Sequence, residues 1–155
     1  MNLNISVELV DDVIQEALRH VDRKKDEHTI TVEHEDELLL ARMDSRLIVQ
    51  MVINLVDNAI KYTNTGGITI KLCSYELFAC VEVTDTGIGI GEEHAAVFGR
   101  FYRGNAVAEK SGVGIGLYLA RFIMQQQGGY IRLSSVPGAG STFGLYFPTA
   151  IVSKL

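Results

Sequence analysis

The chain has 155 residues, of which 47% are hydrophobic and 21% charged, the composition of a soluble globular domain with a full core. Its net charge of −5, with basic residues scattered along the chain, predicts no nucleic-acid partner. No apolar run approaches the roughly 20 residues of a membrane-spanning helix, and no signal peptide opens the chain. We therefore expect one domain over residues 1–155, a cytoplasmic location and no direct membrane contact.

The first half of the chain predicts three strands and two helices. An alternating segment comes first, and a segment with apolar residues at helical spacing follows it. Two strands separated by an acidic turn come next, and then a long helix with Asp44 as its N-cap. The expected bounds are Asn2–Ser6, Val7 to about Arg23, Thr29–Glu33, Leu38–Arg42, and Asp44 to about Thr63.

The second half predicts two hairpins and a third helix that ends at Gly128-Gly129. The expected bounds are Ile68–Cys73, Phe78–Asp85, about Ile115–Gln127, Tyr130–Ser135 and Ser141–Phe147. Residues 86–116 form a glycine-punctuated stretch with at most a short helix around Glu92–Val97, and a loop of this length indicates a functional lid. The element order predicts a two-layer α/β sandwich: a mixed sheet of about five strands plus a hairpin, with three helices on one face.

The two cysteines, Cys73 and Cys80, lie in neighbouring predicted strands and could face each other across a hairpin. Neither occurs in a CxxC or Cys/His metal-binding spacing. We expect two reduced, half-buried thiols.

The long second helix carries a polar stripe on an otherwise apolar surface. At about 100° per residue, an arc of roughly 120° holds Gln50, Asn54, Asn58, Lys61 and Tyr62, although Leu47 and Met51 also project towards it. Asn54 and Asn58 are one turn apart, and their amide oxygens suit a Mg²⁺ that keeps most of its water. Lys61 could meet a phosphate and Tyr62 a base. The alternative is an ordinary amphipathic helix with its polar side in water.

Two glycine loops suit a ligand that approaches the backbone closely. Asp85-Thr86-Gly87-Ile88-Gly89-Ile90 follows a strand directly, so its carboxylate could accept from an exocyclic amine, as on adenine. Gly112-Val113-Gly114-Ile115-Gly116-Leu117 leads into a helix, whose free amides and dipole favour phosphate. Its spacing matches neither a Walker A loop nor a Rossmann fingerprint. Ordinary turns and a flexible hinge are the alternatives.

Between the two loops lies Phe98-Gly99-Arg100-Phe101-Tyr102-Arg103. Its aromatic side chains could anchor a lid while Arg100 or Arg103 turns towards a triphosphate. The alternative is a solvated loop that the aromatic residues merely anchor.

In this order, the four segments resemble the N, G1, F and G2 boxes of sensor histidine kinases. The N box is similar to Asn54–Thr63, the G1 box to Asp85–Gly89, the F box to Phe98–Arg103 and the G2 box to Gly112–Leu117, and Gly140–Pro148 resembles the family's last strand. The resemblance covers nearly the whole chain. It implies the Bergerat fold, which gyrase-type ATPases, heat-shock chaperones and anti-sigma kinases share.

The resemblance also implies a role for each box with Mg-ATP as ligand. Asn58, helped by Asn54, would bind Mg²⁺, Lys61 would meet phosphate, and Arg100 or Arg103 would join them from a lid at residues 91–111. Tyr62 would stack near adenine, and Asp85 would accept from its N6 amine. The remaining contacts would come from Gly87, Ile88, Gly89, Ile90, Tyr102, Gly112, Val113, Gly114, Ile115, Gly116 and Leu117.

Position 54 separates the branches of this superfamily. Relatives of the gyrase and chaperone type carry a Glu there, which can act as a general base on water. Asn54 cannot take a proton, so the resemblance implies phosphoryl transfer to a histidine in place of hydrolysis. The alternatives are an anti-sigma-type serine kinase and a non-enzymatic nucleotide-sensing scaffold of the same fold.

The chain contains no recognisable phosphoacceptor histidine. His34-Glu35-Asp36 lies in a predicted turn without the expected Thr-Pro, and His20, His28 and His94 lack any such context. We expect the acceptor on dimerisation helices upstream in a membrane-anchored bacterial sensor kinase. A response regulator would receive the phosphate through the full-length kinase, and the isolated domain would be a monomer.

Overall fold

The computed structural model describes residues 2–21, 28–35, 38–62, 66–87, 113–136 and 138–149. The elements run in the order β1 (Ser6–Leu9), α1 (Val10–Arg19), β2 (His28–His34), β3 (Leu40–Met43), α2 (Ser45–Tyr62), β4 (Gly66–Tyr75), β5 (Phe78–Asp85), α3 (Val113–Gln126), β6 (Tyr130–Val136) and β7 (Gly140–Pro148). In this part of the chain, no helix combines the length and the hydropathy needed to cross a bilayer.

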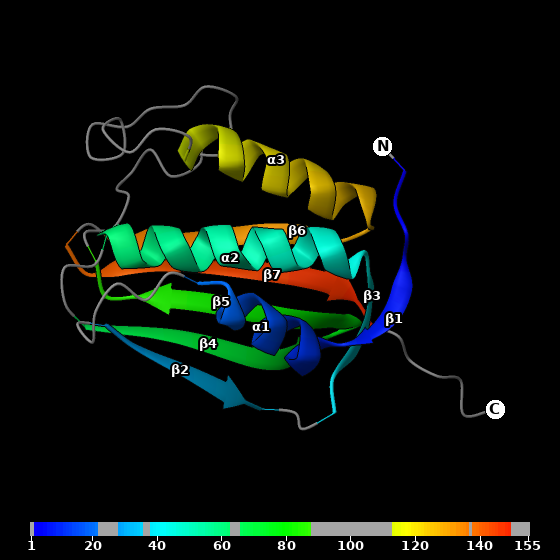
Figure 1. Ribbon diagram of the computed structural model, residues 1–155, viewed down its shortest axis with the longest axis horizontal. Coiled ribbons are helices and arrows are strands. Elements are labelled where there is room, and N and C mark those ends of the chain that lie inside the picture. The colour runs from blue at the N-terminus through cyan, green and yellow to red at the C-terminus, as the bar shows by residue number, and fades with distance from the viewer. Residues whose placement is uncertain are drawn as a thin grey trace.

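Five strands form one mixed sheet in the order β2-β4-β5-β7-β6, and β1 and β3 form a separate two-stranded sheet. β2 runs parallel to β4, and the other neighbours in the large sheet are antiparallel. The helices α1, α2 and α3 lie on one face of this sheet (Figure 1). The predicted two-layer sandwich, with a mixed sheet of about five strands and three helices on one face, is confirmed. The final hairpin, β6–β7, belongs to this sheet, whereas the separate pair joins β1 and β3, which are not neighbours in the chain.

The beginning of the chain differs from the prediction. The first strand begins at Ser6 and α1 at Val10, because Val7 and Leu9 pair with β3 and are therefore extended. The strands predicted at 29–33 and 38–42 exist but do not pair with each other. β2 pairs with β4, which follows α2 in the chain, and β3 pairs with β1. The predicted short helix at 92–97 lies outside the described residues.

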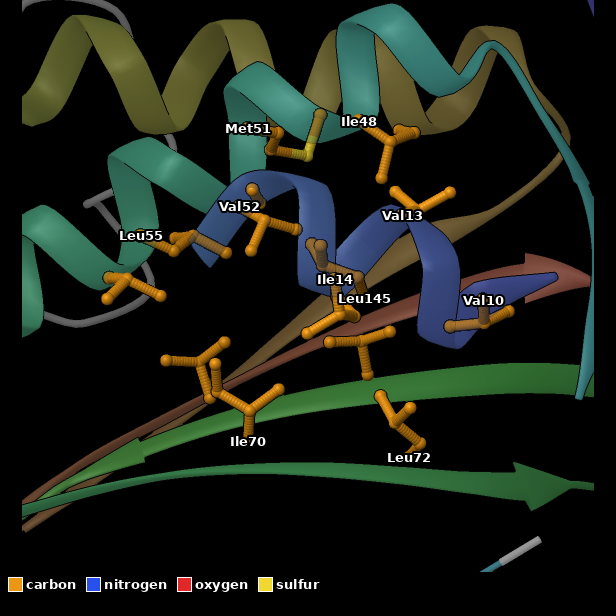
Figure 2. Packing of buried hydrophobic residues seen from close by; sticks show 14 of the residues in the cluster. Val10, Val13, Ile14, Ile48, Met51, Val52, Leu55, Ile70, Leu72 and Leu145 are labelled. Carbon is orange, nitrogen blue, oxygen red and sulfur yellow. The ribbon is translucent and has the colours of Figure 1, made fainter. Parts of the chain in front are cut away.

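The core lies between the helices and the inner face of the sheet. Alternate residues of β4 point inwards, so that Ile68, Ile70 and Leu72 are at most 1% exposed. In Figure 2, side chains of the sheet face the apolar sides of α1 and α2. The labelled sheet residues are Ile70, Leu72 and Leu145, and the labelled helix residues are Val10, Val13, Ile14, Ile48, Met51, Val52 and Leu55. Each such side chain stabilises the fold by roughly 1.5–3 kcal/mol, which fixes how α1 and α2 are rotated on the sheet.

The opposite face of the sheet carries a smaller cluster of thiols and aromatic rings. The cluster consists of Cys73, Cys80 and Tyr146, with Phe78 and Tyr130 packed against it. The rings of Tyr130 and Tyr146 stack with their centroids 4.4 Å apart. The guanidinium of Arg132 lies 5.5–5.6 Å from the ring centroids of these two tyrosines and of Tyr75, which is cation–π distance.

Cys73 and Cys80 lie directly opposite each other on β4 and β5. Both are free, as expected, but they are buried and not half-buried. Burial raises the pKa of both thiols, and that of Cys80 rises to about 12. Since the thiolate is the reactive form of cysteine, this environment keeps the pair inert.

We expect both thiols of the folded protein to react with iodoacetamide at pH 8 about a hundredfold more slowly than the same thiols in urea. Folding lowers the fraction of thiolate and also shields both sulfur atoms from the reagent. Alkylation followed by mass spectrometry of the two peptides measures this ratio. Equal rates for the folded and the unfolded chain would contradict the assignment of an inert pair.

Candidate functional site

Helix α2 presents two of the predicted site residues on its outer side. Asn54 is exposed and Asn58 half-buried, one turn apart, while Val52 and Val56 are completely buried on the opposite side. Asp44 directly precedes the helix, and its carbonyl oxygen accepts from the amides of Leu47 and Ile48, both at 3.1 Å. The polar stripe is therefore turned away from the core by the packing of the apolar side.

The structure describes the stripe only in part, and one apolar neighbour of the stripe differs from the expectation. Met51, which the helical spacing turns towards the polar arc, is instead buried at 4% exposure. It belongs to the same hydrophobic cluster as Ala120 and Met124 of α3. Lys61 and Tyr62 are the last two residues of α2, and their side chains lie outside the described part of the chain.

Asp85 is the last residue of β5, a strand paired on both sides, and it is only 7% exposed. Its Oδ1 accepts a hydrogen bond from the amide of Gly87 at 2.9 Å, and the amide of Ser141 donates to the same carboxyl group. Burial raises the pKa of Asp85, and these two amides oppose the shift. A carboxylate offers about four acceptor positions, so this oriented group can still accept from a ligand.

Ser141 and Gly140 support Asp85 and were not among the predicted site residues. Ser141 pairs with Asp85 across β5 and β7 and is buried, with its hydroxyl 2.9 Å from that of Ser135. Gly140 has a φ of +112°, and a Cβ at this position would lie 2.0 Å from the carbonyl oxygen of Asp85. The sequence showed Gly140 only as the start of the last strand, since its contact with Asp85 exists only in the folded sheet.

The second glycine loop lies partly inside α3. The helix begins at Val113, two residues before the predicted start, so that Gly114 and Gly116 belong to its first turns. The first four amides of a helix have no partner within it, and here they belong to residues 113–116. The predicted amide-rich segment is therefore the helix end itself, together with its dipole.

The described motifs converge at one end of the sandwich. The C-terminal end of β5, the C-terminal end of α2 and the N-terminal end of α3 all lie at the left of Figure 1. Helices α2 and α3 run in opposite directions, so the Asn58 end of one accompanies the Val113 end of the other. The remaining predicted site residues lie outside the described residues: Ile88, Gly89, Ile90, Arg100, Tyr102, Arg103 and Gly112.

An open hollow of about 570 Å³ lies elsewhere, between α1 and the N-terminal half of α2. Its lining includes Glu16, His20, Arg46 and Gln50. Of the predicted polar stripe it contains Gln50 alone, and neither Asn58 nor Asp85 contributes to it. It is therefore separate from the convergent end of the sandwich.

Known proteins resemble this chain closely. Residues 43–151 match the family described as "Histidine kinase-, DNA gyrase B-, and HSP90-like ATPase". The sensor protein KdpD of Clostridium acetobutylicum is 33% identical over 146 residues, and the sensor-like histidine kinase SenX3 of Mycobacterium tuberculosis is 35% identical over 148 residues. Each alignment covers 92% of this chain, but only 16% of KdpD and 36% of SenX3.

Solved structures share the fold. The catalytic domain of the histidine kinase ThkA superposes with a TM-score of 0.81 at 27% identity, over 94% of this chain and 96% of that domain. Full-length ShkA in complex with AMPPNP gives a TM-score of 0.83 at 22% identity, over 99% of this chain and 33% of ShkA. Because residues 43–151 run from the end of β3 through β7, the chain belongs to the family of histidine kinase-, DNA gyrase B- and HSP90-like ATPases, and its fold is that of a histidine kinase catalytic domain.

Proposed function

We propose that this chain binds Mg-ATP and transfers the γ-phosphate to a histidine on a dimerisation helix outside it, for onward transfer to a response-regulator aspartate. The observation that carries the proposal is the buried Asp85 carboxylate, held by the amides of Gly87 and Ser141 at the end of the sandwich where α2 ends and α3 begins. Membership of the ATPase family supports ATP as the ligand.

Asp85 would recognise the base. Its carboxylate accepts hydrogen bonds and, when ionised, donates none, so it suits the N6 amine of adenine and opposes the C6 carbonyl of guanine. Because two backbone amides already hold the carboxyl group, it needs little reorganisation when the base arrives. Gly87, Ile88, Gly89, Ile90 and Tyr62 would complete the base pocket.

Asn54 and Asn58 would hold Mg²⁺. They fit this ion because both lie on the outer side of α2, one helical turn apart, and offer neutral amide oxygens. Mg²⁺ prefers such oxygen ligands when it keeps several waters and shares phosphate oxygens. Bound there, the ion would neutralise charge on the phosphates of ATP. Lys61, three residues after Asn58 and so nearly one turn further along α2, would add a positive charge.

The phosphates would lie against the first turn of α3. The unpaired amides of residues 113–116 and the positive end of the helix dipole favour an anion there. Gly114 and Gly116 carry no side chain, so the phosphates can approach the backbone closely. Arg100, Tyr102 and Arg103 would reach the ligand from the lid, as the resemblance to the F box implies.

Transfer to histidine is favoured over hydrolysis by the chemistry of position 54. An amide side chain cannot accept a proton from water, so the site has no general base there. The relatives are sensor kinases, which favours a histidine acceptor over the serine acceptor of an anti-sigma kinase. The chain spans 16–36% of the length of these relatives, which leaves room in a parent kinase for acceptor helices, a membrane anchor and a regulator-binding surface.

Isothermal titration calorimetry with ATP and ADP, with and without Mg²⁺, tests the nucleotide site. We expect binding in the micromolar range that Mg²⁺ strengthens, because the ion links Asn58 to the phosphates. GTP should compete poorly, since its C6 carbonyl faces the Asp85 carboxylate. An absence of heat at high protein concentration would sink the proposed function.

Two substitutions should separate the metal from the base. Asp85→Ala should weaken ATP and adenosine alike, by roughly ten- to a hundredfold, because a hydrogen bond to a charged group is lost. Asn58→Ala should weaken Mg-ATP but leave adenosine unaffected. Gln50→Ala, two turns before Asn58 on the same helix, is the matched control and should bind both ligands normally. A loss of adenosine affinity in Asn58→Ala would contradict the assigned roles.

We expect the purified chain to release almost no phosphate from ATP. The reason is the missing base at Asn54, and a coupled phosphate assay on a sample with calorimetrically proven binding measures it. Asp85→Ala is the control for contaminating ATPases, because only hydrolysis at this site should disappear with it. Rapid turnover that Asp85→Ala abolishes would overturn the role given to Asn54.

A further inference from the structure

A buried glutamine joins the far ends of the two helices that frame the proposed site. Gln127 directly follows α3 and is 8% exposed. Its Oε1 accepts a hydrogen bond from the amide of Asp44 at 2.9 Å, and its Nε2 donates to the carbonyl oxygen of Ile123 at 3.4 Å. The first of these bonds connects positions 83 residues apart in the chain.

The backbone around Gln127 fixes where its side chain points. The amide of Gly129 donates to the carbonyl oxygen of Met124 at 2.9 Å, and that of Gly128 to Gln125 at 3.1 Å. With the φ of +79° at Gly128, these two bonds form a Schellman motif that ends α3. A Cβ on Gly129 would lie 2.1 Å from the carbonyl oxygen of Tyr146, so this helix end is seated directly on β7.

Asp44, the partner of Gln127, is equally well fixed. It is 2% exposed and directly precedes α2. Its Oδ2 accepts from the amide of Asn4 at 3.0 Å, in the segment before β1. The end of α3, the start of α2 and the segment before β1 therefore meet in one hydrogen-bonded joint, in which the bond between Asp44 and Gln127 is buried.

The joint lies at one end of α3, so a small rotation there would displace the opposite, phosphate-binding end of the helix. Since α2 and α3 are antiparallel, the joint lies at the right of Figure 1 and the Asn58 and Val113 ends lie at the left. The 14 residues of α3 span about 21 Å. A swing of about 5° at the joint would move the first turn of α3 by about 2 Å, and misplacement by about 1 Å can cost a hundredfold in rate.

We propose that Gln127 is a positioning residue, whose hydrogen bond to the Asp44 amide sets the distance between the phosphate-binding end of α3 and the metal-binding side of α2. This inference rests on the proposed function, because it assumes that phosphate lies against α3 and Mg²⁺ against α2. Adenine is recognised from β5, so its binding does not depend on this distance. Phosphate bridges the two helices and depends on it directly.

Gln127→Met tests the proposal, because methionine has nearly the same length but no comparable acceptor for the Asp44 amide. NMR titrations at pH 8 measure the dissociation constants of Mg-ATP and of adenosine. We expect the affinity for Mg-ATP to fall about tenfold or more while that for adenosine changes less than about twofold, since only the bridging ligand senses the helix spacing. Gln126→Met is the matched control, because Gln126 is exposed on the same helix end.

Gln127→His should restore Mg-ATP binding, because one nitrogen of a neutral imidazole can accept from the Asp44 amide while the other donates. Hydrogen exchange at the Asp44 amide reports the bond itself. It should be slow in the native chain, in Gln126→Met and in Gln127→His, and fast in Gln127→Met.

The outcomes separate this inference from the proposed function. An equal loss of both ligands in Gln127→Met, or no loss of either, would overturn the positioning role while ATP binding by the native chain stands. A Gln127→Met chain that fails to fold leaves Gln127→His and the exchange rate of the native Asp44 amide to decide. Fast exchange of that amide in the native chain would refute the joint, and a native chain that binds no nucleotide would refute both proposals.

Discussion

The rotation of α2 on the sheet is the constraint on which the rest of the molecule depends. The helix has to bury Ile48, Val52 and Val56 against the strands, and this burial leaves Asn54 and Asn58 on the outer side. Since residues along a helix are about 100° apart, a rotation by one position towards the core side would bury the amides and expose the valines. The packing of the core therefore determines the orientation of the candidate metal ligands.

The described site is assembled from the ends of elements. Asp85 ends β5, Val113 begins α3, and Ser141 lies next to the start of β7. Such positions combine two properties. Regular structure holds the backbone in place, and because its hydrogen-bonding pattern stops there, backbone amides become available to side chains and ligands. The Asp85 carboxyl uses both, because its strand is paired on either side while its oxygens accept from the amides of Gly87 and Ser141.

Local patterns in the sequence predict much of the fold. The bounds of β5 agree with prediction at both ends, because alternation and a following glycine turn define that strand without help from elsewhere. The predicted start of α1 at Val7 is wrong, because pairing with β3 makes Val7 and Leu9 extended and a local apolar spacing does not reveal that pairing. The predictions for Asn54, Asn58 and Asp85 concern residue types whose chemistry is visible locally. Local patterns do not predict the roles of Gly140 and Gln127, because each contacts a partner far away in the sequence.

The cluster on the outer face of the sheet makes part of the molecule visible to ultraviolet light. The chain has no tryptophan and six tyrosines, so its near-ultraviolet absorption and emission come almost entirely from tyrosine. Half of these rings, Tyr75, Tyr130 and Tyr146, share one packed group beside Arg132. The group lies on the face of the sheet opposite the helices, so its contribution to the dichroic signal reports the integrity of the sheet on that face. The protein thus contains its own optical probe of folding, set apart from the end where its chemistry is proposed to occur.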